Sequence, residues 1–156
     1  GGRAEDWVGP GAGADDAGVA RKIAAIEAGL TLHPGRDPAS VLSTFGGREQ
    51  AATCGAVLAA RARRIPVLLD GFICTAAAAV LHAVDERLLD HALIGHVSAE
   101  PGHRRLLQAL GKRPVLDFDM RLGEGTGAAL ALGVVRAALA CHNGMATFDE
   151  AGISGA

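Results

Sequence analysis

Residues 114–129 read Pro-Val-Leu-Asp-Phe-Asp-Met-Arg-Leu-Gly-Glu-Gly-Thr-Gly-Ala-Ala, and this stretch decides the fold. Its first part, 114–118, is an apolar run of strand length, and an apolar helical pattern runs from residue 128 to about residue 141. The turn between them carries one carboxylate, Glu124, bracketed by Gly123, Gly125 and Gly127. Because glycine permits tight, positive-φ backbone, the stretch predicts a strand, a sharp turn and a helix.

Two interpretations of Glu124 are open at this point. A glycine-flanked acid at the mouth of a helix is well placed to meet a substrate, since glycine lets a ligand approach closely. The alternative is an ordinary helix start with Glu124 in the first turn, where the helix dipole favours a negative charge. The loop alone favours this second interpretation, because a single short motif carries a high risk of false matches.

The same strand–helix pattern occurs twice more upstream. Short apolar runs at 66–69 and 92–95 are predicted strands, and helical patterns follow them at 73–84 and 101–110. Three further helices are predicted before these, at 16–28, 38–42 and 48–63. Asp15 or Asp16 is the predicted N-cap of the first, and Asp37 is the predicted N-cap of the second. Strands that alternate with helices predict right-handed crossovers. The predicted fold is therefore α/β, a Rossmann-like, three-layer arrangement with a parallel sheet flanked by helices.

Composition narrows the class of protein. The chain has 156 residues, 49% hydrophobic and 21% charged, which is typical of one globular domain. A net charge of −2 gives no basic surface for nucleic acid, and no apolar run is long enough for a membrane span. The three cysteines, Cys54, Cys74 and Cys141, have no metal-ligand spacing and sit among small apolar residues, so buried thiols and a reducing, cytoplasmic setting are predicted.

Polar residues gather where the predicted strands end. In parallel sheets, ligands bind beyond the carboxyl ends of the strands. The residues at these ends are Asp70, His96, Ser98, Asp117, Asp119, Arg121 and Glu124. Local alternatives stay open for three of them: Asp70 could cap the helix near residue 73, Ser98 could cap the helix at residue 101, and His96 could be a hydrogen-bonded loop histidine. The remaining histidines show no partner spacing and are interpreted as surface or structural: His33, His82, His91, His103 and His142.

Several blocks of the chain, in order, resemble one family. The blocks are 9–16, 20–23, 46–49, 67–73, 96–100, 120–129 and 145–152. Together they resemble the nicotinate-nucleotide–dimethylbenzimidazole phosphoribosyltransferases, which make the lower-ligand nucleotide of cobalamin. The resemblance begins at the first residues, and the first half of the family has no counterpart here. Residues 1–156 are therefore expected to be the C-terminal part of a single phosphoribosyltransferase domain, and the family suggests a homodimer.

The resemblance implies a reaction and a set of site residues. The reaction transfers a 5-phosphoribosyl group from nicotinate mononucleotide to 5,6-dimethylbenzimidazole, giving α-ribazole 5′-phosphate and nicotinate, and needs neither cofactor nor metal. Glu124 matches the catalytic base, Lys22 the phosphate-binding lysine, and Asp70 an acidic position for which ribose hydroxyl binding is expected. Anion-binding donors at helix starts are also expected, from Ser98, Gly123, Gly125 and Thr126.

Two other interpretations compete with an enzyme. The chain could be a catalytically silent, truncated fragment that acts only as a binding or assembly module, because half of the family's length is absent. It could also be an unrelated nucleotide-binding α/β domain, which the ordered blocks disfavour. The chain alone is expected to lack transferase activity.

Overall fold

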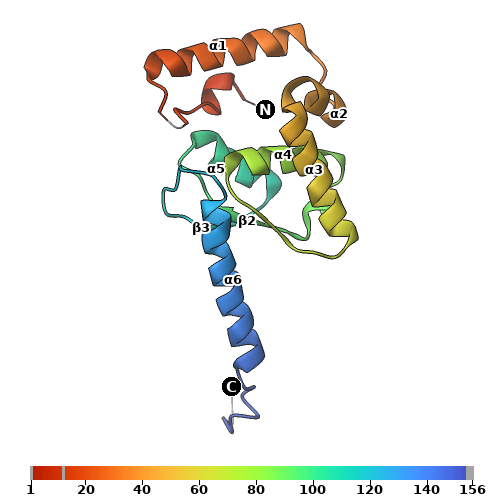
Figure 1. Ribbon diagram of the computed structural model, residues 1–156, viewed down its shortest axis with the longest axis vertical. Helices are drawn as coiled ribbons and strands as arrows, with labels where there is room; N and C mark the ends of the chain where they lie inside the picture. Colours follow the sequence, from red (N-terminus) through yellow and green to blue (C-terminus); the bar gives the residue numbers. More distant parts are fainter. Residues whose placement is uncertain (1, 12, 154–156) are drawn as a thin grey trace.

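The computed structural model describes residues 2–11 and 13–153 (Figure 1). Its elements follow the predicted order of helices first and strand–helix units second. They are the short 3-10 helices η1 (Ala4–Asp6) and η3 (Glu86–Leu89), the π-helical turn η2 (Leu42–Gly46), the helices α1 (Asp16–Leu32), α2 (Pro38–Val41), α3 (Gly47–Ala62), α4 (Phe72–Val84), α5 (Pro101–Leu110) and α6 (Thr126–Gly144), and the strands β1 (Val67–Leu69), β2 (Ala92–His96) and β3 (Pro114–Leu116).

The three strands form one parallel sheet in the order β1-β2-β3. Val67 aligns with Ala92 across the first pair, and His96 aligns with Leu116 across the second. Each connection passes through a helix, α4 between β1 and β2 and α5 between β2 and β3. The prediction of an α/β fold with a parallel sheet flanked by helices is confirmed.

The two faces of β2 are covered unequally. Ala92 and Ile94 point to one face and are buried with side chains of α3 and α4, including Val57 and Ala78. Leu93 points to the other face and is 44% exposed. Gly95 on that same face meets α6, because a Cβ added to Gly95 would lie 3.0 Å from the Ala128 Cα. The core thus lies between the sheet and helices α3, α4 and α5, the last of which contributes Leu107.

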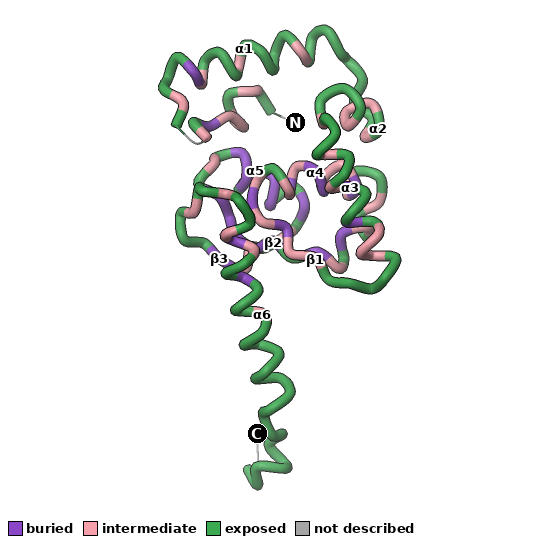
Figure 2. The backbone as a smooth tube through the Cα atoms, in the orientation of Figure 1, coloured by how far each residue is buried: buried purple, intermediate pink, exposed green. Residues whose placement is uncertain are grey.

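Two helices extend away from this core (Figure 2). Gly18 is the one buried residue of α1, and the buried residues of α6 are Gly127 and Ala131, both near its start. Beyond them α6 continues as an isolated rod, with Val134 and Leu139 exposed. The described residues therefore leave most of α1 and the second half of α6 without tertiary packing.

Some predicted boundaries were wrong for identifiable reasons. Helix α1 continues past Gly29 to Leu32, because an isolated glycine costs a helix only about 1 kcal/mol. It stops at His33, which precedes Pro34 and has the non-helical backbone typical of that position. Strand β3 ends at Leu116 rather than at residue 118, since its partner β2 ends at His96.

The prediction of three buried thiols was correct for Cys54 alone. Cys54 is buried between α3 and α4, and this burial raises the pKa of its thiol. Cys74 is half-buried, and Cys141 is exposed because, among the described residues, its part of α6 is not covered by another element. In the described part of the chain, no helix is both long and apolar enough to cross a membrane.

Candidate active site

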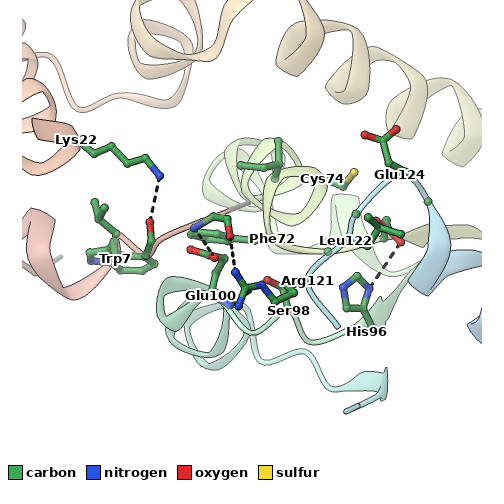
Figure 3. A pocket seen from close by; sticks show the side chains of 18 of the residues that line it. Trp7, Lys22, Phe72, Cys74, His96, Ser98, Glu100, Arg121, Leu122 and Glu124 are labelled. Carbon is green, nitrogen blue, oxygen red and sulfur yellow. Dashed lines mark hydrogen bonds and ion pairs between the residues drawn. The ribbon is translucent and has the colours of Figure 1, made fainter. Parts of the chain in front are cut away.

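A cavity of about 1010 Å³ opens at the carboxyl ends of the strands (Figure 3). Its wall comes from the loop before α1, from α1 itself, from the ends of β1 and β2 and the loop after β2, from the start of α4, and from the turn before α6. The lining residues are Trp7, Val8, Gly9, Gly11, Lys22, Ala25, Ile26, Asp70, Gly71, Phe72, Ile73, Cys74, His96, Ser98, Glu100, Arg121, Leu122, Gly123, Glu124 and Gly125. Six of the seven residues predicted for the site are among them, and Thr126 is the exception.

The turn that carries Glu124 has an unusual backbone. Gly123, Glu124 and Gly125 have φ angles of 76°, 57° and 75°, so three consecutive residues are left-handed. Glycine adopts this conformation freely, whereas a residue with a side chain is held there only when its surroundings demand it. Glu124 also precedes the N-cap, Gly125, so it is not in the first turn of α6 as the dipole interpretation required. Its side chain is exposed, so the described residues do not supply the burial that favours a general base.

Asp70 holds the start of α6 from across the sheet. The backbone N–H of Ala128 donates a 2.8 Å hydrogen bond to Asp70 Oδ1. The helix that follows Asp70 in sequence, α4, has Gly71 as its N-cap and receives no side-chain cap. The alternative in which Asp70 caps its own helix was therefore wrong. Asp70 instead fixes the position of α6, and with it the turn that carries Glu124.

The ring of His96 fills the space between the start of α4 and the start of α6. It is 1% exposed, and its ring lies against Gly71 and Gly127, where any Cβ would collide with it. His96 Nδ1 lies 3.6 Å from Asp70 Oδ1, too far for a hydrogen bond, and it has no hydrogen-bond partner among the described residues. The interpretation as a hydrogen-bonded loop histidine was wrong, since His96 is the last residue of β2.

Lys22 is bound to the loop that precedes α1. Its ammonium donates to the backbone oxygens of Gly9 at 3.2 Å and Pro10 at 3.4 Å. The same loop is held from the other side, because Gly11 N–H donates to Glu100 Oε1 at 2.9 Å and Arg121 donates to Gly11 O at 3.3 Å. In Figure 3, Lys22 and Glu124 lie at opposite ends of the cavity. Lys22 therefore sits at the rim of the cavity and is not simply a solvated helix lysine.

Ser98 is buried in the loop after β2. Its hydroxyl accepts a hydrogen bond from Glu100 N–H at 3.1 Å, and its own N–H donates to His103 Nδ1 at 2.9 Å. The N-cap of α5 is Glu100, which makes no side-chain cap, so the alternative of Ser98 as that cap was wrong. Of the two roles predicted for His103, the structural one is confirmed, because it is fully buried.

Thr126, and two of the polar residues predicted at the strand ends, Asp117 and Asp119, do not line the cavity. The Thr126 hydroxyl donates to Gly123 O at 2.7 Å and so closes the glycine turn from behind. Asp117 forms a two-bond ion pair with Arg104, with contacts of 2.8 and 3.0 Å, and Asp119 does not line the cavity. Of the polar residues that follow β3, Arg121 and Glu124 therefore line the cavity, whereas Asp117 and Asp119 do not.

Sequence reasoning missed the apolar part of the wall. Trp7, Phe72, Cys74 and Leu122 lie on the cavity surface beside the charged groups. Two of them could have been identified in the sequence because they lie next to predicted site residues. Phe72 follows the predicted strand end at Asp70, and Leu122 precedes the glycine turn. An apolar wall with a few charged groups suits a planar aromatic ring attached to a charged group.

The charges in the lining are mixed. Lys22 and Arg121 are cationic, whereas Asp70, Glu100 and Glu124 are anionic. Behind the wall, burial lowers the pKa of His103 to about 4, with smaller contributions from His96 and Arg104, so its ring is neutral near pH 7. Within residues 2–11 and 13–153, no group of three or more His, Cys, Asp or Glu side chains could hold a metal ion.

Comparison with known proteins identifies the family to which this site belongs. A family model described as phosphoribosyltransferase matches residues 1–153. The chain belongs to this phosphoribosyltransferase family. A relative from Rhodobacter capsulatus, named nicotinate-nucleotide–dimethylbenzimidazole phosphoribosyltransferase, is 66% identical over 154 residues. A Brucella anthropi relative of the same name is 60% identical over 157 residues.

A solved structure agrees with the family. The crystal structure of CobT from Thermus thermophilus superposes with a TM-score of 0.90 at 45% identity and covers 98% of this chain. The match covers 99% of this chain but 46% of the Rhodobacter and Brucella relatives, and 46% of the Thermus chain. The chain therefore spans about half the length of the relatives that it matches.

Proposed function

We propose that this chain forms the nucleotide-holding part of a site that transfers a 5-phosphoribosyl group from nicotinate mononucleotide to 5,6-dimethylbenzimidazole, as in cobalamin biosynthesis. The observation that carries the proposal is the left-handed Glu124, an acid held in a strained conformation at the mouth of the cavity. Strain of this kind costs about 1–3 kcal/mol and concentrates at functional sites. Family membership and the names of the relatives support the same reaction.

The proposed chemistry is a displacement at the anomeric carbon. One ring nitrogen of the benzimidazole attacks C1′ of the ribose, and the bond from C1′ to the nicotinate nitrogen breaks. The proton on the other ring nitrogen passes to Glu124, the proposed general base. The pyridinium leaving group is already cationic, so it leaves without a general acid. Alignment of the two rings in one cavity supplies much of the remaining rate enhancement.

The proposed binding roles follow the charges of the wall. Lys22 binds the 5′-phosphate, since an ammonium suits an anion. The N–H groups of Ser98 and Glu100 already donate within the protein, so the Ser98 loop supports the wall of the cavity rather than binding the phosphate. At the opposite end of the cavity, the turn at Gly123 and Gly125 contacts the substrate beside Glu124. Thr126 supports that turn through its bond to Gly123 O. Asp70 lies at the same cavity and is proposed to reach the ribose hydroxyls with the carboxylate oxygen that does not bind Ala128.

A silent binding module is the second candidate. The exposed side chain of Glu124 and the coverage of 46% of the relatives favour it. Under this alternative the chain binds the nucleotide or a partner but does not contribute to catalysis.

Binding of nicotinate mononucleotide to this chain tests the proposal. Trp7 is the only tryptophan, the chain has no tyrosine, and Trp7 lines the cavity, so its fluorescence reports occupancy directly. We expect saturable quenching by nicotinate mononucleotide and much weaker binding of nicotinate riboside, which lacks the phosphate. Equal affinity for the two, or no saturable change with either, would contradict the proposed phosphate site.

We also propose that the chain self-associates as a homodimer and resides in the cytoplasm. Exposed Leu130, Val134 and Leu139 on α6 support self-association, because apolar patches recruit partners. Sedimentation of the purified chain tests it, and a clean monomer would count against the homodimer.

A further inference from the structure

His103 occupies a position between two parts of the cavity wall. It lies on α5, is 0% exposed and does not line the cavity itself. Its Nδ1 accepts a 2.9 Å hydrogen bond from Ser98 N–H, and its Nε2 lies 3.2 Å from Thr75 Oγ1. Because Nδ1 is an acceptor, the ring proton of the neutral imidazole sits on Nε2 and is donated to Thr75.

Through Thr75, His103 is also connected to the end of strand β1. The Thr75 hydroxyl donates at 2.8 Å to the backbone oxygen of Gly71, which follows β1. The ring of Phe72, beside Gly71, stacks on His103 with centroids 5.7 Å apart and an interplanar angle of 25°. Ser98, Gly71 and Phe72 all line the cavity. One buried imidazole therefore connects the loop after β2 with the turn after β1.

The loop at Ser98 also supports the loop before α1, which Lys22 binds on the other side of the cavity. Ser98 Oγ accepts from Glu100 N–H, and the Glu100 carboxylate accepts from Gly11 N–H in the loop that Lys22 binds. A shift of Ser98 would thus be transmitted toward Lys22. Fixed hydrogen bonds of this kind set the spacing between groups that contact one substrate.

We infer that His103 is a positioning residue, whose neutral imidazole holds the Ser98 loop and the Gly71 turn at the spacing that the phosphoribosyl group requires, an inference that rests on the proposed function. His103 acts through these neighbours and does not touch the substrate. A purely structural histidine would contribute to folding alone, so the two roles differ in what its replacement does to binding.

The test compares binding with stability in this chain. His103→Leu keeps the apolar bulk but removes both hydrogen bonds. His103→Asn keeps an acceptor at the position of Nδ1, so it retains the bond from Ser98. Thr75→Val keeps the shape of Thr75 and removes the link to Gly71. His91→Leu is the matched control, because His91 also contacts a backbone oxygen, that of Val57 at 3.0 Å, but lies away from the cavity.

Nicotinate mononucleotide is the probe, with Trp7 fluorescence as the readout at a temperature where every variant is folded. We expect His103→Leu to raise Kd about ten-fold, the loss typical of a buried hydrogen bond. Thr75→Val should raise Kd several-fold, His103→Asn should recover most of the affinity, and His91→Leu should stay within about two-fold of the wild type. ¹⁵N NMR of the wild type should show His103 with a bare Nδ1 and a protonated Nε2.

The outcomes separate the two proposals. If the wild type binds and His103→Leu binds equally well, the positioning role is overturned while the proposed function stands. An equal loss in His103→Leu, His103→Asn and His91→Leu would also overturn it, because general destabilisation would then explain the effect. If His103→Leu does not fold, the Kd values of His103→Asn and Thr75→Val test the positioning role instead. Wild-type affinity in Thr75→Val would then overturn it. A wild-type chain that does not bind the probe overturns the proposed function, and the inference with it.

Discussion

At the scale of single residues, the backbone of Glu124 is the most informative observation. Its neighbours Gly123 and Gly125 accept left-handed φ angles without strain, whereas Glu124 does not. Alanine or glycine would satisfy the fold equally well or better. Arg64 and Asp119 also have left-handed backbone, but of these three residues Glu124 alone lines the cavity, which supports the proposal that its carboxylate acts there.

Glu124→Gln is the first prediction, made in a chimera in which this chain replaces the matched stretch of the Rhodobacter capsulatus relative. Glutamine keeps the shape but cannot accept the proton, so kcat should fall about 10²–10⁴-fold while substrate binding survives. The melting temperature should hardly change, because the exposed side chain makes few packing contacts. Near-normal turnover would leave the site without an identified base.

Lys22→Ala in the same chimera is the second prediction. A charge-assisted contact to phosphate is worth about 1.5–3 kcal/mol, so KM for nicotinate mononucleotide should rise by about 10- to 100-fold with kcat less affected. Arg21→Ala is the control, since Arg21 is the adjacent exposed cation on α1 and does not line the cavity. Equal effects of the two substitutions on KM would mean that Lys22 acts only through its positive charge and does not contact the phosphate.

At the scale of elements, the start of α6 depends on a residue far away in sequence. Asp70 Oδ1 accepts from Ala128 N–H across 58 positions of the chain, at the end of β1. A helix start has free N–H groups that need acceptors, and the local sequence Gly125-Thr126-Gly127 provides no side-chain cap. The orientation of α6, and of the turn before it, is thus set by the sheet.

Asp70→Ala is the third prediction, measured by amide hydrogen exchange at Ala128. Loss of the acceptor should speed exchange there by about ten-fold, since a cap is worth about 1 kcal/mol. Asp70→Asn should restore most of the protection because its amide oxygen can accept the same bond. Asp37→Ala removes a comparable cap from α2, where Ser40 N–H donates to Asp37, and should leave Ala128 unchanged. Unaltered exchange in Asp70→Ala would refute the cap.

The pH dependence of stability is the fourth prediction. The pKa of His103 is lowered from 6.5 to about 4 in the folded chain, so the unfolded chain binds a proton more readily. Its contribution to stability is complete above pH 6.5 and is lost as pH falls toward 4, by up to about 3 kcal/mol. Between pH 7 and pH 5 the free energy of unfolding should fall by about 2 kcal/mol more in the wild type than in His103→Leu.

Urea denaturation at the two pH values measures this difference. His96 and Arg104 also face His103 and act on its proton, but both remain in the variant, so the comparison isolates the imidazole. Identical pH slopes for the wild type and His103→Leu would show that His103 is not kept neutral by the fold.

The elements themselves were largely predictable, because apolar periodicity and local caps determine them. Asp15 and Asp37 cap α1 and α2 as predicted, and the three strands lie where short apolar runs occur. The candidate site was predictable where residues follow strand ends or match the family blocks. The contacts of Asp70 with α6 and of His103 with Ser98 and Thr75 were not, since they join positions that only the folded chain brings together.

At the scale of the whole molecule, the described chain is a core with two unpacked helices. Most of α1 and the second half of α6 are exposed, and one face of β2 is covered by the first turns of α6 alone among the described residues. The chain matches 46% of the length of its relatives. We therefore expect the cavity to hold the nucleotide without enclosing the acceptor base.

Formation of α-ribazole 5′-phosphate by the chimera tests the central proposal most directly, and it is the fifth prediction. Nicotinate mononucleotide and 5,6-dimethylbenzimidazole are supplied, and product is followed by chromatography for the chimera, for the Rhodobacter capsulatus relative and for this chain alone. The chimera should form product at a rate comparable to that of the relative, and the chain alone should form none. A folded chimera that makes no product beside an active relative would contradict the account, because this chain would then not supply its share of the site.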